Sequence, residues 1–188
     1  MRILASIAAL TGLCQGVVPH FSLKAVQPLF DDIYGVAPRI GVGIAFPQSS
    51  NFAFRTELTG LYGTGRPGFS SYHKLGVMAR AAEQVNLRPV LDAYLDGGVM
   101  YAYARECQPY ADTNGVITYR WGSGSAMGLF AEGGAILARS SRLRLDFEVG
   151  LDLVAIQTDL QLPGRYPSYS TVSLSGLSAG FVLSLVQP

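Results

Sequence analysis

The alternation of charged and apolar residues between positions 142 and 153 constrains the fold of this chain most. Every second side chain here is apolar, and the side chains between them are charged apart from Gly150. Neighbouring side chains of a β-strand point to opposite faces, whereas a helix would scatter both sets around its circumference. Residues 142–156 are therefore predicted to form a strand with two different faces. The apolar set is Leu143, Leu145, Phe147, Val149, Leu151 and Leu153, and the opposite set is Arg142, Arg144, Asp146, Glu148, Gly150 and Asp152.

The same period of two recurs along most of the chain after residue 20. Ile40 and Val42, for example, alternate with Arg39 and Gly41. Residues 78–84 are also rich in good helix formers, but the strand is the preferred interpretation. Together with residues 142–156, the predicted strands are residues 21–27, 39–46, 52–62, 72–82, 88–103, 125–137 and 171–185, which gives about eight strands.

The predicted connections alternate between short and long. This alternation is typical of bacterial outer-membrane barrels, which have tight periplasmic turns at one rim and longer loops at the other. It predicts an all-β fold, a single antiparallel up-and-down transmembrane β-barrel of about eight strands. The short connections are residues 47–50, 83–86 and 138–141, and the long ones are residues 28–36, 63–70, 104–124 and 157–170.

Composition agrees with a membrane protein built of strands. Charged residues make up only 14% of the chain and hydrophobic residues 49%, against roughly 25% charged residues in ordinary soluble domains. After the N-terminus, no run reaches the ~18 consecutive apolar residues of a membrane-spanning helix. The net charge is +1 without a basic cluster, so the basic surface of a nucleic-acid-binding protein is missing.

The N-terminus has the pattern of an export signal. Arg2 is followed by an apolar stretch at residues 3–13 and then by small residues, so residues 1–16 are interpreted as a signal peptide and residues 17–188 as the barrel domain. The alternative is a buried N-terminal helix of the mature domain.

The two cysteines give little support to other chemistry. A lipoprotein signal at Cys14 is weaker than ordinary cleavage, because Leu13 stands where a small residue is required. Removal of the signal leaves Cys107 alone, which forms no internal disulfide and lacks the spacing of a zinc site. No cofactor and no metal are expected.

Periodicity alone does not say which face of the strands points inward, since a soluble lipocalin-like barrel has the opposite polarity. The export signal, the low charge content and the small residues on the charged face favour a membrane barrel with a charged lumen. Side chains nearly fill an eight-stranded interior, so a salt-bridged plug is expected, with a narrow pore as the alternative. The predicted interior polar network contains Arg55, Glu57, Lys74, Arg80, Asp92, Asp96, Glu132, Arg142, Arg144, Asp146, Glu148 and Asp152.

Several segments resemble known barrels. Residues 30–35 precede a Gly-rich strand, residues 87–90 open a long strand that ends at residues 97–101, and residues 174–181 form the last strand. In these segments the chain resembles small outer-membrane barrels of the OmpA/OmpX type and the wider porin-like group, over most of residues 20–185. The resemblance implies a barrel in the outer membrane of a Gram-negative-type bacterium, and it implies no particular activity.

The function expected from the sequence is non-enzymatic. A structural or surface-interaction barrel needs no reactive residues, and the long loops would contact a partner outside the cell. The alternatives are a narrow pore for small solutes, a lipid-modifying enzyme and a soluble ligand-binding barrel. An enzyme is disfavoured because His20 and His73 are the only histidines, and Ser71 lies about 7 Å from His73 along its strand, too far for a hydrogen bond. Expected partners are outer-membrane lipid and an extracellular molecule, without nucleic acid, and the protein is expected to be a monomer.

Overall fold

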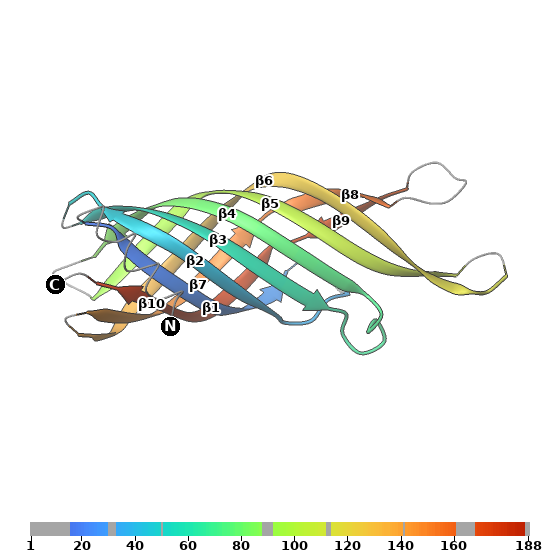
Figure 1. Cartoon of the computed structure of the whole chain (residues 1–188), viewed down its shortest axis with the longest axis horizontal. Helices are drawn as coiled ribbons and strands as arrows, with labels where there is room; N and C mark the ends of the chain where they lie inside the picture. Colours follow the sequence, from blue (N-terminus) through green and yellow to red (C-terminus); the bar gives the residue numbers. More distant parts are fainter. Residues whose placement is uncertain are drawn as a thin grey trace, which may run out of the picture.

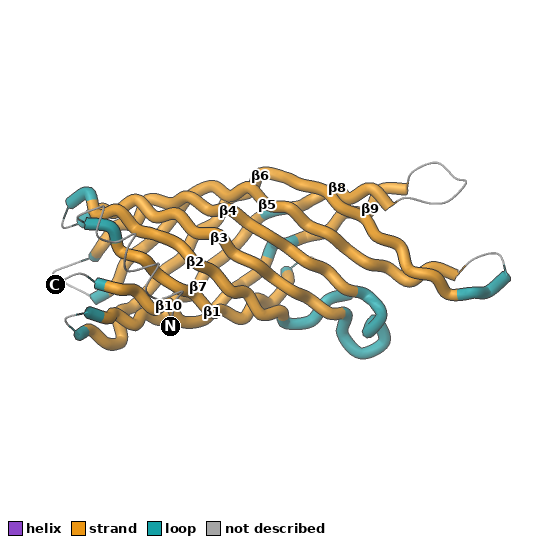
Figure 2. Tube along the Cα trace, viewed as in Figure 1, coloured by secondary structure: helices purple, strands orange, loops and turns teal. Residues whose placement is uncertain are grey.

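The computed structural model describes residues 16–29, 33–49, 51–87, 92–111, 114–140, 142–160 and 168–186. All of the signal peptide predicted at residues 1–16 except Gly16 lies outside these residues. The elements are strands, and no described helix is long and apolar enough to cross a bilayer (Figure 2). The strands are β1 (Val18–Pro28), β2 (Ala37–Pro47), β3 (Phe52–Thr64), β4 (His73–Asn86), β5 (Ala93–Ala111), β6 (Ile117–Arg139), β7 (Leu143–Leu153), β8 (Ala155–Leu160), β9 (Ser168–Ser173) and β10 (Gly176–Leu185).

The strands form one closed antiparallel barrel. They pair in the order β5-β4-β3-β2-β1-β10-β7-β6-β8-β9, and a further pairing of β5 with β6 closes the circle (Figure 1). β8 continues β7 and β9 leads into β10, so the ten strands occupy eight positions around the barrel wall. We call each position a stave; the eight staves confirm the predicted up-and-down architecture. We call the end with the β2–β3, β4–β5 and β6–β7 connections the turn rim and the opposite end the loop rim.

A side chain replaces part of the strand ladder where β7 gives way to β8. The hydroxyl of Ser175 accepts a hydrogen bond from the amide of Val154 at 2.8 Å and donates to the carbonyl of Val154 at 3.1 Å. The amide of Leu174 also donates to this carbonyl, at 3.1 Å. Both staves are therefore interrupted at the same height and continue beyond the interruption as β8 and β9.

The loop predicted at residues 104–124 is largely strand, and the described parts of the loop predicted at residues 157–170 are strands too, so the prediction is wrong there; residues 161–167 lie outside the described residues. β5 and β6 pair from Ala93↔Ala135 to Ala111↔Ile117, and β8 pairs with β9. In Figure 1 these strands extend well beyond β1 to β4 at the loop rim. We call residues 105–111 and 117–123 with β8 and β9 the projecting sheet. Its period of two, with Tyr119 and Trp121 on one face, continues that of the barrel strands.

The short turn predicted at residues 83–86 is also misplaced. These residues are the last four of β4 and pair with residues 94–97 of β5. The helix considered for residues 78–84 is wrong, because they alternate between the two faces of a strand. Tertiary pairing on both edges overrides the helix propensity of this alanine-rich segment.

The wall has the polarity of a membrane barrel. Leu58, Val149 and Leu177 point outward with 50–54% of their surface exposed, whereas Arg39 and Glu148 point inward and are fully buried. Apolar groups outside and charges inside suit a lipid environment. The soluble lipocalin-like alternative requires the opposite polarity and does not fit this structure.

Candidate functional site

The lumen contains a layer of ion pairs centred on Glu132. One carboxylate oxygen of Glu132 lies 2.7 Å from Lys24 Nζ, 3.0 Å from Arg39 Nη2 and 2.9 Å from Arg80 Nη1. Asp152 binds two of the same cations. Its Oδ2 pairs with Arg39, and its Oδ1 accepts a hydrogen bond from Arg80 Nη2 at 2.8 Å. Because these side chains come from β1, β2, β4, β6 and β7, the layer connects strands across the barrel.

A second group of charges lies next to it, toward the turn rim. Arg55 Nη1 is 2.7 Å from Asp96 and 2.6 Å from Glu148, and Lys24 Nζ is 2.5 Å from the other oxygen of Glu148. The Tyr94 hydroxyl donates a hydrogen bond to Glu148, and the same hydroxyl lies 3.1 Å from Asp146 Oδ2. We call the two groups together the lumen network. Its members are His20, Lys24, Arg39, Arg55, Glu57, Arg80, Tyr94, Asp96, Glu132, Arg144, Asp146, Glu148 and Asp152.

Three of the residues predicted for the interior network lie elsewhere. Lys74 is buried at the loop rim, away from the ion pairs around Glu132; it lies opposite Glu106 of β5, and its Nζ donates to the carbonyl of Ser173 at 3.1 Å. Asp92 and Arg142 are exposed at the turn rim, beside the strands rather than within them. The structure brings together the other nine: Arg55, Glu57, Arg80, Asp96, Glu132, Arg144, Asp146, Glu148 and Asp152.

The sequence prediction missed His20, Lys24, Arg39 and Tyr94. A signal for three of them exists in the pattern: Arg39 shares the parity of Gly41, and His20 and Lys24 share the parity of the small polar Ser22. Tyr94 carries no such signal, because an aromatic residue fits either face of a strand. Its inward position depends on Gly134, its cross-strand partner on β6.

Two glycines make room for the lumen network. A Cβ atom at Gly134 would lie 2.2 Å from the Cζ atom of Tyr94, so the ring occupies the space of the missing side chain. At Gly41 a Cβ would lie 2.2 Å from the Glu57 carboxylate. A glycine on the inward face therefore lets a long polar side chain from the next staves cross the narrow lumen.

The lumen is apolar on the loop-rim side of the network, which the sequence analysis did not anticipate. We call this part the apolar layer. Phe130 joins the two regions, because the Arg80 guanidinium lies 3.7 Å from the centre of its ring, a cation–π contact. The layer consists of Val26, Ala37, Leu61, Met78, Met100, Ala102, Ala104, Phe130, Val154, Ile156, Val172 and Leu174.

Polar side chains close the lumen again above the apolar layer. Lys74 Nζ lies 4.2 Å from the centre of the Tyr34 ring, and Tyr34 is buried where the β1–β2 connection approaches the loop rim. The Thr158 hydroxyl donates to Glu106, which also accepts from Gln108 at 2.8 Å. The interior thus has three successive fillings: charged, apolar and polar.

The cavities found inside the barrel are small. One of about 10 Å³ lies between Arg55, Arg80, Asp96 and Phe130, which is space for one water molecule. Arg55 Nη2, Arg80 Nε and Asp96 Oδ1 have no protein partner among the described residues and are polar groups that such a water can bind. A second cavity, of about 90 Å³, opens at the turn rim beside His20.

A metal ion would fit only one group of described carboxylates. Oxygens of Asp96, Glu132 and Glu148 lie within 4.8 Å of one another. Arg55 and Lys24, however, already place cationic nitrogens against these oxygens at 2.5–2.7 Å. The ammonium and guanidinium groups thus balance the charge that a metal would otherwise balance.

The described side-chain hydrogen bonds of the two histidines are made with Tyr62 and Arg55, although Ser184 is the cross-strand neighbour of His20. His73 Nδ1 is 3.0 Å from the Tyr62 hydroxyl, and the two rings are stacked on the outer wall. His20 Nε2 accepts from Arg55 Nε at 3.2 Å in the lumen. A nucleophile must be within hydrogen-bond reach of its base, and the described contacts of both rings are made with other partners.

Replacing Tyr94 with Phe is expected to lower the free energy of unfolding by about 1–3 kcal/mol, because Glu148 loses a buried donor. Urea unfolding in phospholipid vesicles measures this change. Tyr101→Phe is the matched control, since Tyr101 is half exposed on the outer wall. Equal losses for the two variants would show that the hydroxyl of Tyr94 contributes nothing to the network.

Comparison with known proteins identifies the fold. No family model and no curated protein sequence matches the chain. Among solved structures, it is similar to the outer membrane protein OprG from Pseudomonas aeruginosa (TM-score 0.57, 8% identity, 90% of this chain and 94% of that one). It is also similar to the outer membrane protein AlkL (TM-score 0.55, 16% identity, 90% and 86%). A third similar structure is Neisserial surface protein A (TM-score 0.50, 15% identity, 89% and 94%).

These likenesses extend over almost the whole barrel at very low sequence identity, so they concern the arrangement of the strands. The apolar outer wall and the buried charges of the lumen agree with them. The OmpA/OmpX type named from the sequence is not among these three structures. The chain has the fold of the small outer-membrane β-barrels.

Proposed function

We propose that this protein is a closed, non-enzymatic barrel of the outer membrane that does not conduct solutes and that presents its projecting sheet at the cell surface. The observation that carries the proposal is the filled lumen. Glu132 holds three cations from three strands in the middle of the barrel. A solute would have to break these buried ion pairs, each of which compensates a large desolvation cost.

The apolar layer is a second barrier. Met78, Met100 and Ile156 are at most 1% exposed and fill the lumen. Their side chains offer no polar groups that could replace the water molecules around an ion. Hydrophobic constrictions of this kind close pores by excluding water. The narrow-pore alternative would require both layers to rearrange together.

The purified barrel is expected to be silent in a planar lipid bilayer. Folded protein is first verified by its change in gel mobility on boiling in SDS, and a general porin inserted in the same bilayer serves as the positive control. Discrete conductance steps from the folded protein would overturn the closed-barrel proposal in favour of the pore.

A surface-interaction role is favoured by the projecting sheet. Ile117, Tyr119 and Trp121 expose 50–66% of their surfaces beyond the barrel wall. Arg105 lies 4.6 Å from the centre of the Trp121 ring and holds it in place. Exposed aromatic and apolar groups on a rigid sheet are typical of interaction surfaces.

Shortening the tip of the hairpin tests this role. Replacing residues 109–119 with Asn-Gly joins the paired residues Gln108 and Arg120 through a two-residue turn. The shortened barrel is expected to keep its heat-dependent gel mobility. In the full chain, a photoreactive amino acid placed at position 117 is expected to form adducts on intact cells. Absence of adducts at position 117, with the same probe at lipid-facing Gly60 as the background control, would remove the surface role.

A further inference from the structure

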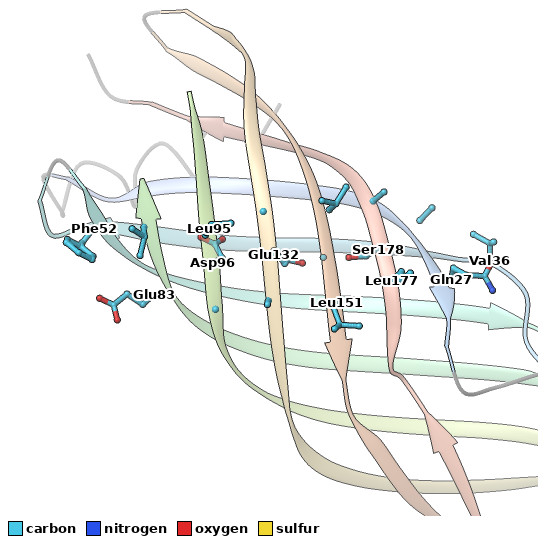
Figure 3. A pocket seen from close by; sticks show the side chains of 18 residues that line it. Gln27, Val36, Phe52, Glu83, Leu95, Asp96, Glu132, Leu151, Leu177 and Ser178 are labelled. Atoms are coloured by element: carbon cyan, nitrogen blue, oxygen red, sulfur yellow. The ribbon is translucent and has the colours of Figure 1, made fainter. Parts of the chain in front are cut away.

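The outer wall of the barrel has a long groove that the lumen network and the projecting sheet do not explain. Its volume is about 1160 Å³, and apolar atoms form most of its lining. Figure 3 shows Phe52 and Glu83 at one end and Gln27 and Val36 at the other, with Leu95, Leu151 and Leu177 between them. The lining also contains Gly97, Ala131, Gly133 and Ala179, whose missing or short side chains form the floor.

The groove follows one row of cross-strand neighbours. Glu83 pairs with Gly97, Gly97 with Ala131, Ala131 with Leu151, and the row continues through Leu177 to Gln27. It crosses six staves, about 24 Å at roughly 4.8 Å per strand. Because Glu83 is near the turn-rim end of β4 and Gln27 near the loop-rim end of β1, the groove rises through the bilayer.

Glu83 is an unusual residue for this position. It is exposed and points outward, and it makes no hydrogen bond or ion pair with the residues that the structure describes. Among the described residues of β1 to β4, it is the only Asp, Glu, Lys or Arg that points outward. An ionisable residue at the lipid boundary without a compensating protein group commonly marks a functional site.

The depth of Glu83 identifies the part of a lipid that it meets. It lies three residues before the end of β4, about 10 Å along a tilted strand from the turn rim. Phe54 is its cross-strand partner on β3, and the tilted rings of Phe46 and Phe54 lie with their centres 6.5 Å apart. Aromatic side chains of this kind mark the membrane interface, so the carboxylate reaches the headgroup region of the leaflet at the turn rim.

We propose that the groove binds a glycerophospholipid with a primary ammonium headgroup. The ammonium donates hydrogen bonds to the Glu83 carboxylate, and an acyl chain lies over Gly97 and Ala131. Charge complementarity selects the headgroup, since an anionic lipid would be repelled. The small side chains of the floor allow the chain to lie close to the backbone, as small residues do at other close contacts within membranes.

The test reconstitutes the full chain in nanodiscs of equal parts phosphatidylethanolamine and phosphatidylglycerol, and mass spectrometry measures the lipids that remain bound after mild detergent extraction. Wild-type protein is expected to retain phosphatidylethanolamine preferentially. Glu83→Gln is expected to reduce this preference about tenfold, the loss of one charge-assisted hydrogen bond. Glu83→Lys is expected to reverse it toward phosphatidylglycerol.

A glycine substitution tests the acyl part of the site independently. A Cβ at Gly97 meets nothing within 4 Å, so Gly97→Val fills the groove without disturbing the fold and is expected to reduce the bound lipid of both classes. Gly60→Val is the matched control, because Gly60 is equally open on the outer wall but lies outside the groove lining. It is expected to leave the bound lipid unchanged.

Three results would overturn the proposal. The first is an unchanged preference in Glu83→Gln. The second is equal retention of phosphatidylcholine, which has no N–H donors, when it replaces phosphatidylethanolamine in the nanodiscs. The third is a dimer in lipid-free detergent that Gly97→Val dissociates, which would make a second copy the occupant of the groove. Conductance through the barrel would overturn the closed-barrel proposal but leave the lipid-groove proposal intact. The two proposals can therefore fail independently.

Discussion

Glu132→Gln is expected to lower the free energy of unfolding of the barrel by about 3–5 kcal/mol, the cost of removing one partner from a buried ion-pair group. The amide is almost isosteric with the carboxylate, so the change removes charge and leaves the packing. Lys24, Arg39 and Arg80 each lose their common anion, while their side chains stay at most 4% exposed. The network then has three cations whose remaining partners are Glu57, Glu148 and Asp152.

The loss is measured by urea unfolding in phospholipid vesicles, followed by tryptophan fluorescence and by the gel mobility of unboiled samples. Glu83→Gln in vesicles without ammonium lipid is the matched control, because it removes the same charge from the outer wall and is expected to change stability by less than about 0.5 kcal/mol. A loss below 1 kcal/mol for Glu132→Gln would mean that water, rather than Glu132, compensates the three cations.

Phe130→Ala is expected to cost about 3–5 kcal/mol, because it leaves a cavity between the lumen network and the apolar layer. Phe130 is 7% exposed, and its ring lies against the guanidinium of Arg80, so the change also removes a cation–π contact. Met78 and Met100 are flexible enough to reduce the cavity in part, which places the expected value toward the lower end of the range.

The same unfolding assay measures this variant, with Phe130→Leu as the control that retains most of the volume and is expected to lose less. The bilayer experiment adds an independent measurement. Phe130→Ala leaves the ion pairs of Glu132 with Lys24, Arg39 and Arg80 in place, so these still close the lumen and the variant is expected to remain silent. Conductance in this variant would show that the apolar layer is the main barrier.

The architecture could be predicted from the sequence because the lumen and the lipid impose opposite chemistry on alternate residues. In β7, Asp146, Glu148 and Asp152 are buried, and Leu145 and Phe147 on the other parity face outward. A single strand of this kind is enough to establish the period and the two faces. The parity also indicates which charges share the lumen, but not which of them meet, because Lys24 and Glu132 are 108 residues apart.

Two features could not be predicted, for separate reasons. The period of two does not separate the apolar layer from the lumen network. Met78, Met100 and Phe130 have the same inward parity as Arg80 and Asp96, and they differ only in their height along the barrel axis. The projecting sheet was hidden by its composition. Residues 104–124 contain Pro109, Gly115 and Gly122, which are common loop residues, and the hydrogen bonds of one long hairpin decide their conformation.

The distribution of the lumen charges among the staves has a consequence for assembly. The charged pairs of the β1–β2 hairpin in the network are made by two cations, Lys24 and Arg39, and their anions are on β6 and β7. The residues of this hairpin therefore cannot neutralise its two lumen cations. β10 brings no charged residue into the lumen and pairs with β1 and β7 on its two edges. Lys24 and Arg39 thus meet their anions only when the barrel closes, so closure and charge neutralisation coincide for this hairpin.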